Sequence, residues 1–278
     1  MSNSERHTPD RENYNNDGGK QPEGQTEFET ARDQAATAVN AERKSSGRQA
    51  VAPAWHTAVL VVVLLVIALL GARSPHTFSA RHGRTWLYGT SIAWEWLIVA
   101  FIAWGVRGRV RLRHLIRRSS VDGPVSSVAG DIVWGVMAWI AISIVLSMVA
   151  TTFGMVHGNQ IAEVKEKLGF LIPRDAVELR WFLALSATAA FCEEVIFRGY
   201  LQRQMSAWTG NATLGVLLQA AVFGIGHAYE GRERMLLIFL YGGLLGIVAE
   251  ARRNLRAGML AHFLQDGITG VVLYRLLR

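Results

Sequence analysis

The segment FCEEVIFRGY, residues 191–200, places two adjacent glutamates and an arginine, Glu193, Glu194 and Arg198, in an otherwise apolar run. On a helix, Glu194 and Arg198 are four residues apart, so they share one face in the order that favours an ion pair. Glu193 would then point about 100° away around the helix and stay outside that pair. A free carboxylate in a water-poor pocket can act as a general base.

Two later segments add imidazoles and a third carboxylate. FGIGHA places His227 four residues after Phe223, and HFLQD places Asp266 four residues after His262. A charged group at mid-membrane costs about 3 kcal/mol or more, so such groups usually face a cavity or a partner. A base, two imidazoles and a carboxylate around a buried wet pocket are parts for activating water, with or without a metal.

The elements that must carry these residues are predicted by apolar stretches of about 20 residues, the length that spans a bilayer as a helix. Seven such stretches occur, at residues 54–72, 86–106, 128–153, 178–203, 212–228, 235–251 and 255–274. The sequence therefore predicts an all-α fold, a polytopic transmembrane helix bundle of about seven spans, within a range of six to eight. At a rise of ~1.5 Å per residue, the four chemical groups fall in the middle of a core about 30 Å thick and could converge on one cavity.

The first three stretches carry fewer ionisable residues, namely His56, Glu95 and Asp131. The single cysteine, Cys192, excludes an intrachain disulfide and a multi-thiolate metal site. A nucleophilic role for it is conceivable, but a small buried hydrophobe is favoured. GGLLG, residues 242–246, places two glycines one turn apart, which is typical of close helix packing.

Composition divides the chain into three parts. Residues 1–53 are polar, with almost no large apolar side chains, and are predicted to be a disordered cytoplasmic tail. Residues 54–177 hold the N-terminal transmembrane helices and their loops, and residues 178–275 hold the three chemical segments. Residues 161–172, IAEVKEKLGFLI, could form an amphipathic helix at the membrane surface.

Loop charge predicts the orientation of the bundle. RGRVRLRHLIRR, residues 107–118, carries six arginines, and positively charged loops stay in the cytoplasm. Counting back two spans places the N-terminus in the cytoplasm as well, although three arginines in residues 73–85 argue weakly against this. The basic loop favours contact with anionic lipid headgroups over nucleic acid, because it lacks interleaved aromatic residues.

The three segments resemble a known family. EEVIFR fits EExxxR, FGIGH fits FxxxH and HFLQD fits HxxxN/D, and the glycines of GGLLG and the GY after Arg198 also fit. In that order, within membrane helices, they are similar to the CAAX prenyl endopeptidase and bacteriocin-processing family, the Abi-type intramembrane proteases. The resemblance covers residues 178–275 and implies proteolysis in or near the membrane. The substrate is expected to be a membrane-anchored protein or peptide.

The resemblance also implies roles for the residues. Glu193 would activate water, Glu194 and Arg198 would support it as a pair, and His227 would act with Glu193 on the water. His262 and Asp266 would stabilise the oxyanion or complete the polar pocket. Asp266 stands where the family accepts Asn or Asp, and an Asp donates a hydrogen bond only when protonated. A role orienting His262 is therefore equally open.

Metal dependence and two other classes of function stay open at this stage. The family is often labelled metalloprotease, and His227, His262 and one carboxylate would suffice for a catalytic Zn²⁺. A glutamate-activated water without metal would use the same residues. A transporter, a haem-binding protein or a non-catalytic scaffold could also use intramembrane His, Glu and Asp, but duplicated halves typical of transporters are absent. HExxH and GxSxG are absent as well.

Overall fold

The computed structural model describes residues 32–34, 49–73, 83–117, 127–155 and 160–277. The chain divides into two compact units, Met1–Gly47 and Arg48–Arg278. In the first unit only residues 32–34 are described, so the prediction of a disordered tail lies almost entirely outside the described residues. The fold and the site belong to the second unit.

The regular elements of the described residues are helical, apart from one isolated bridge between Arg117 and Asn254. Seven long helices occupy the seven predicted stretches: α2 (Ala54–Arg73), α4 (Arg84–Gly105), α6 (Val128–Thr152), α8 (Ala176–Glu193), α10 (Ala212–Gly226), α11 (Arg232–Arg252) and α12 (Arg256–Leu276). Shorter elements are α5 (Leu112–Ile116), α7 (Gln160–Leu168) and the 3₁₀ turn η2 (Ala228–Glu230). The all-α prediction is confirmed, and α7 forms within the segment expected to be amphipathic.

The helix that carries the two glutamates is longer than predicted and changes its winding. After α8 it continues as a π-helical segment, η1 (Glu194–Leu201), and then as α9 (Gln202–Thr209). π-helical turns are rare and often mark functional positions. Asp175 starts this helix, because its carboxylate accepts hydrogen bonds from the backbone N–H groups of Val177 and Glu178. Gly210, in the left-handed conformation, ends it.

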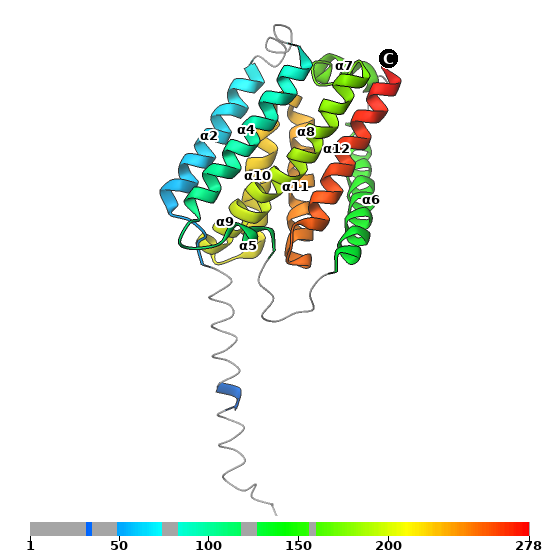
Figure 1. The fold of residues 1–278 in the computed structure, drawn as a ribbon. Coiled ribbons are helices and arrows are strands. Elements are labelled where there is room, and N and C mark those ends of the chain that lie inside the picture. The colour runs from blue at the N-terminus through cyan, green and yellow to red at the C-terminus, as the bar shows by residue number, and fades with distance from the viewer. Residues whose placement is uncertain (1–31, 35–48, 74–82, 118–126, 156–159, 278) are drawn as a thin grey trace, which may run out of the picture. The chain divides into compact units, whose positions relative to one another are not determined.

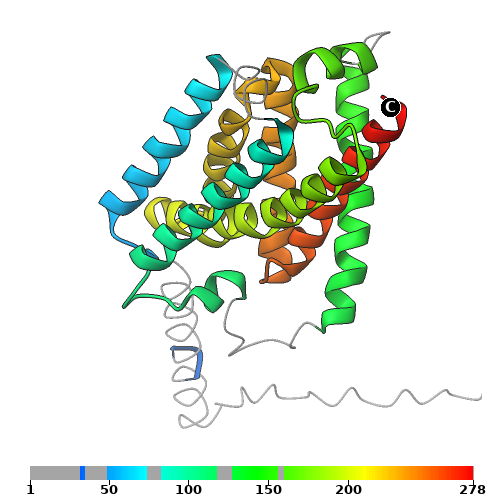
Figure 2. The ribbon, with the colours of Figure 1, turned by 45° about the horizontal axis from the view of Figure 1, so that its top comes forward.

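Figures 1 and 2 show α8, η1 and α9 running through the middle of this unit. Helix α4 packs on one side of α8 and α12 packs on the other, while α6 covers α12 and α11 pairs with α10. In both views α2 and α6 lie at opposite edges of the bundle. The centre of the bundle is therefore the helix with the acidic residues.

The outer surface of the helices is apolar, as lipid contact requires. Helices α4, α6 and α11 are long and apolar enough to cross a membrane, and α2 and α10 contain shorter apolar segments, by length and composition alone. On α6, for example, Val133, Met137 and Met148 are exposed. These helices indicate an integral membrane protein.

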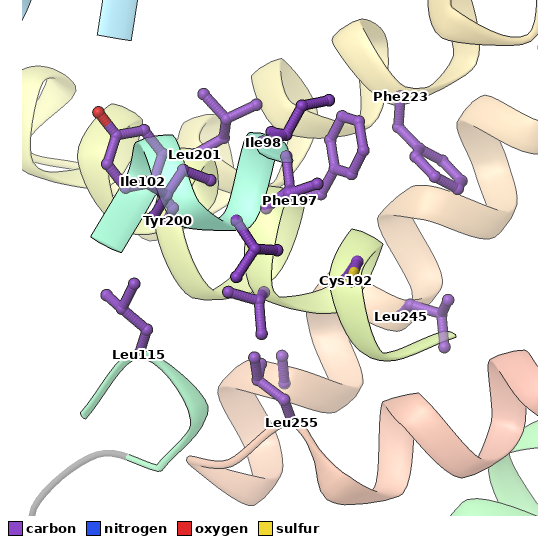
Figure 3. Packing of buried hydrophobic residues seen from close by; sticks show 14 of the residues in the cluster. Ile98, Ile102, Leu115, Cys192, Phe197, Tyr200, Leu201, Phe223, Leu245 and Leu255 are labelled. Atoms are coloured by element: carbon purple, nitrogen blue, oxygen red, sulfur yellow. The ribbon is translucent and has the colours of Figure 1, made fainter. Parts of the chain in front are cut away.

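Buried side chains from α4, α8, η1, α10 and α11, together with some from the surrounding helices, form the core (Figure 3). Phe197 and Phe223 meet edge to face with ring centroids 4.8 Å apart. Cys192 is fully buried in the same cluster, in agreement with its expected role as a small hydrophobe. This core lies against the polar residues described below, so it holds them in a water-poor setting.

The glycines of GGLLG allow polar side chains to reach the backbone of α11. A Cβ at Gly242 would lie 2.8 Å from Phe223, and one at Gly246 would lie 2.7 Å from Gln202. The carbonyl oxygen of Gly242 accepts hydrogen bonds from Arg198 at 3.2 Å and Gln219 at 3.0 Å. The expected close packing is confirmed, and it also exposes carbonyl groups to buried donors.

Two further polar contacts join distant parts of the bundle. The buried carboxylate of Asp131, at the start of α6, accepts hydrogen bonds from Arg252 at 2.8 Å and Asn254 at 3.2 Å and pairs with Arg256. At another point, the side chain of Gln204 accepts the backbone N–H groups of residues 51 and 52 at 2.8 and 3.1 Å and donates to the carbonyl of residue 52 at 3.0 Å.

Candidate active site

The predicted ion pair between Glu194 and Arg198 is present and fully buried. Arg198 Nη1 lies 2.9 Å from Glu194 Oε1, and both side chains are inaccessible to solvent. Arg198 also donates to the Gly242 carbonyl, and its guanidinium lies over the ring of Phe223, 4.5 Å from the centroid. A fully buried ion pair with these additional contacts supports the site rather than reacting itself.

His262 links this support to the other acids. Its Nδ1 lies 3.2 Å from Glu194 Oε1, while its Nε2 lies 3.7 Å from Glu193 Oε2 and 3.5 Å from Asp266 Oδ2. Gly258, one turn earlier on α12, makes the approach possible, because a Cβ there would lie 3.0 Å from Glu194 Oε2. Nδ1 of this imidazole therefore faces Glu194, and Nε2 faces Glu193 and Asp266.

Exposure separates the acids into two kinds. The side chain of Glu194 is 0% exposed and that of His262 is 4% exposed, whereas Glu193 is 20% and Asp266 is 36% exposed. Glu193 and Asp266 therefore form the accessible edge of the cluster. A substrate or an attacking water can meet these two carboxylates without disturbing the Glu194–Arg198 pair.

His227 joins the cluster from the end of α10. It occupies the position after the last helical residue, and its Nδ1 donates a hydrogen bond to the carbonyl of Phe223 at 2.9 Å. In the neutral imidazole, that bond places the proton on Nδ1 and leaves a lone pair on Nε2. The rings of Phe223 and His227 lie 4.9 Å apart, and His227 interacts electrostatically with Asp266.

The structure thus brings all six predicted residues into one region. Glu193, Glu194, Arg198, His262 and Asp266 are linked by direct contacts, whereas His227 connects to them through the ring of Phe223 and through its electrostatic interaction with Asp266. The residues come from three separate stretches of sequence, and their convergence is the main feature of the site.

Three residues near the site were not assigned to it from sequence. Glu95 on α4 interacts electrostatically with Glu193 and Asp266. The ring of Tyr241 lies 5.6 Å from that of His262, and Glu230 interacts electrostatically with Asp266. An acid within an apolar stretch was a visible signal for Glu95, whereas nothing in the sequence marks Tyr241 or Glu230 out from other tyrosines and loop acids.

A cavity of about 480 Å³ lies at the end of the bundle near α7 and η2. Residues from α6, α7, η2 and the start of α11 line it, among them Thr151, Lys167, Glu230 and Arg234. Glu230 lines the cavity and also interacts electrostatically with Asp266, so the cavity is coupled to the site through this residue.

The side chains present do not fit a metal ion in this arrangement. No group of three or more His, Cys, Asp or Glu side chains with the spacing needed to hold a metal occurs among the described residues. To become a metal ligand, His262 would have to turn Nδ1 away from Glu194 or turn Nε2 away from Glu193 and Asp266. The Zn²⁺ suggested by the resemblance therefore has no place in the mechanism derived from these contacts.

The site is a buried polar cluster with an accessible carboxylate, set in a bundle of apolar helices. In a comparison with known families, residues 175–268 match the family model described as type II CAAX prenyl endopeptidase Rce1-like. The matched segment runs from Asp175 to the middle of α12 and includes all six predicted site residues. The resemblance seen in the sequence is confirmed for this segment and indicates a protease. No curated protein and no solved structure matches the chain.

Proposed function

We propose that this protein is an intramembrane endopeptidase in which Glu193 activates a water molecule to hydrolyse a peptide bond. The contrast between the two adjacent glutamates carries this proposal. Glu194 is fully buried and paired with Arg198 at 2.9 Å, whereas Glu193 is partly exposed and lies beside His262 without that partner. Of the two, Glu193 is the carboxylate that can accept a proton from water.

The proposed reaction uses the other residues in distinct roles. Glu193 takes a proton from water while the Nε2 lone pair of His227 helps to hold that water, and the oxygen bonds to the scissile carbonyl carbon. Once Glu193 has taken the proton, it no longer competes as a carboxylate for His262 Nε2, and this imidazole stabilises the negative charge that develops on the carbonyl oxygen. Asp266, 3.5 Å from His262 Nε2, orients that imidazole. Glu193 then passes its proton to the leaving nitrogen as the C–N bond breaks.

The surroundings of the site support a membrane-anchored protein or peptide as the substrate. The site lies within a bundle that contains long apolar helices, and Glu230, which interacts electrostatically with Asp266, lines a mixed-charge cavity. A peptide held at the membrane could place a bond near Glu193 without leaving the bilayer surface. The arginine-rich segment around α5 is proposed to contact anionic headgroups on the cytoplasmic side, which would also place the N-terminus in the cytoplasm.

The test compares new protein termini in membranes of cells that carry the wild type or the Glu193→Gln variant at matched expression. Glutamine keeps the size of the side chain and removes the base. Cleavage sites found with the wild type are expected to disappear with the variant. Glu250→Gln is the matched control, because Glu250 accepts a hydrogen bond from Gln202 and lies outside the site.

Matching profiles from wild type and Glu193→Gln, with both proteins folded and abundant, would overturn the protease proposal. Transport or scaffolding by the same polar cluster would then become the leading interpretation. Loss of the same cleavage sites in Glu250→Gln would also count against a specific role for Glu193, because an acid outside the site would have given the same result.

A further inference from the structure

Glu95 is an acid of the site that the family resemblance does not include. It lies on α4, outside the matched residues 175–268. Its carboxylate oxygen Oε2 is buried and has no hydrogen-bond partner among the described residues. A buried oxygen without a donor is costly, so its retention calls for a physical reason.

Helix packing directs Glu95 toward the accessible edge of the site. Helix α4 packs along α8, and Trp96 stacks on Phe191 with ring centroids 5.5 Å apart and planes 28° apart. The stack fixes the level at which α4 meets α8. Glu95 lies on the same face of α4 as Ile98 and Ile102, which are buried, so its side chain points into the bundle. Glu95 interacts electrostatically with both Glu193 and Asp266.

The positive groups nearby do not balance these acids. The charge of Arg198 is taken up by Glu194, and His262 is the imidazole in contact with Glu193 and Asp266. Carboxyl groups that lie close together in a water-poor site do not all ionise, and the remaining proton belongs to the group of acids rather than to one of them. Such pairs of carboxyl groups divide the roles of acid and base between them.

We infer that Glu95 and Glu193 form a carboxyl pair that shares one proton, in which Glu95 holds the proton while Glu193 acts as the base. The inference rests on the proposed function and adds a residue to it. Glu95 acts through Glu193 and is a positioning residue: its O–H donates to Glu193, which fixes the direction of the carboxylate and supplies the buried oxygen with a role.

The proton balance of the reaction is unchanged by this pair. One proton of the attacking water goes to Glu193 as the oxygen bonds to the carbonyl carbon, and that proton moves to the leaving nitrogen as the C–N bond breaks. The proton held by Glu95 stays in the pair throughout. The pair therefore returns to its starting state at the end of each turnover without another reactant.

The first measurement does not depend on proteolysis. Full-length protein in lipid nanodiscs is treated with a hydrophobic carbodiimide, which modifies protonated carboxyl groups, and modification of Glu95 is quantified by mass spectrometry across a range of pH. We expect Glu95 to be modified in the wild type and less modified in Glu193→Gln, where no second carboxylate shares the proton. Glu250→Gln, folded to the same extent, is expected to leave the labelling of Glu95 unchanged.

The second measurement uses a substrate found by the comparison of termini. Leucine at position 95 removes the donor, so Glu95→Leu is expected to lower kcat by about 10²-fold, at the lower end of proton-handling effects, with KM nearly unchanged. Glu95→Gln keeps a neutral donor and is expected to restore most of kcat. It should also keep activity to higher pH, because an amide has no proton to lose on the alkaline side.

The outcomes separate this inference from the proposed function. If the wild type is active and Glu95→Leu and Glu95→Gln lose activity equally, or neither loses any, the carboxyl pair is overturned and the protease function stands. Labelling of Glu95 that is the same in the wild type and in Glu193→Gln would also overturn the pair. If the wild type is inactive but labelling of Glu95 falls in Glu193→Gln, the protease mechanism is overturned and the shared proton is still supported. Rescue by glutamine together with coupled labelling supports both.

Discussion

Two buried clusters of acids and arginines hold this bundle together, and their charge balance differs. At the start of α6, Asp131 binds Arg252, Asn254 and Arg256, so two cations and an amide serve one carboxylate. In the site, Arg198 serves Glu194, while Glu193 and Asp266 share His262. The first cluster has more cations than acids, and the second has more acids than cations.

This difference explains why one cluster joins helices and the other can react. A carboxylate whose oxygens are all occupied by cations has no capacity left for a proton from water. The additional acids of the site are the groups that can take and return protons. The arginines of the Asp131 cluster are also 19% and 33% exposed, so their charges are partly solvated, whereas the Glu194–Arg198 pair is fully buried.

The largest expected effect is a loss of activity when Glu193 is replaced. Glu193→Gln should lower kcat by about 10²- to 10⁴-fold or more, the usual contribution of a general base. Thermal stability in detergent should match the wild type, because Glu193 has no part in the buried ion pair. A large drop in stability together with activity would show that Glu193, like Asp131, is structural.

The next effect is on stability and comes from the buried pair. Glu194→Leu leaves the charge of Arg198 buried without its carboxylate and should cost about 3–5 kcal/mol. The measurement is thermal unfolding of the purified protein, followed by its helical signal. Glu194→Leu combined with Arg198→Met tests the cause, since removing both charges should recover much of the loss. Failure to recover would point to lost packing instead.

A smaller loss is expected at the start of α6. Asp131→Asn keeps the shape of the side chain and removes its charge, which should cost about 1–3 kcal/mol because Arg252 and Arg256 can reach solvent. Cleavage by the variant, corrected for folded protein, should remain at the wild-type level. If Asp131→Asn lowers activity as much as Glu193→Gln does, the two clusters do not differ in function.

The smallest effect is expected from metal removal. Both nitrogens of His262 face carboxylates, so treatment with a strong chelator should leave cleavage unchanged. Elemental analysis of the purified protein before and after treatment shows whether any metal was present to remove. Loss of activity that zinc restores would mean that His262 changes partners in the working enzyme, and the proposed mechanism would need revision.

Local spacing in the sequence was enough to predict the helices and the nearest contacts. The four-residue spacings of Glu194 with Arg198 and of His262 with Asp266 appear directly as contacts in the structure. The seven apolar stretches predicted the seven long helices, because burial in lipid demands long apolar helical segments. These features depend only on the period of a helix.

Contacts between distant segments were beyond this reasoning. The bond between His262 and Glu194 joins residues 68 positions apart, and it exists because Gly258 lets α12 approach the acidic helix. The π-helical winding of η1 was missed because an α-helical period was assumed throughout. Glu95 was seen as an acid in an apolar stretch, but its electrostatic interaction with Glu193 depends on how α4 packs on α8.

The hydrogen bonds of Gln204 limit how far the chain can be shortened from its N-terminus. Its carboxamide makes three hydrogen bonds to the backbone of Val51 and Ala52, so these residues are held against α9 although they precede α2. An affinity tag or a fluorescent protein joined ahead of residue 48 leaves these hydrogen bonds intact. Truncation past Ala52 breaks them, and a shortened version for crystallography should therefore retain Val51 and Ala52.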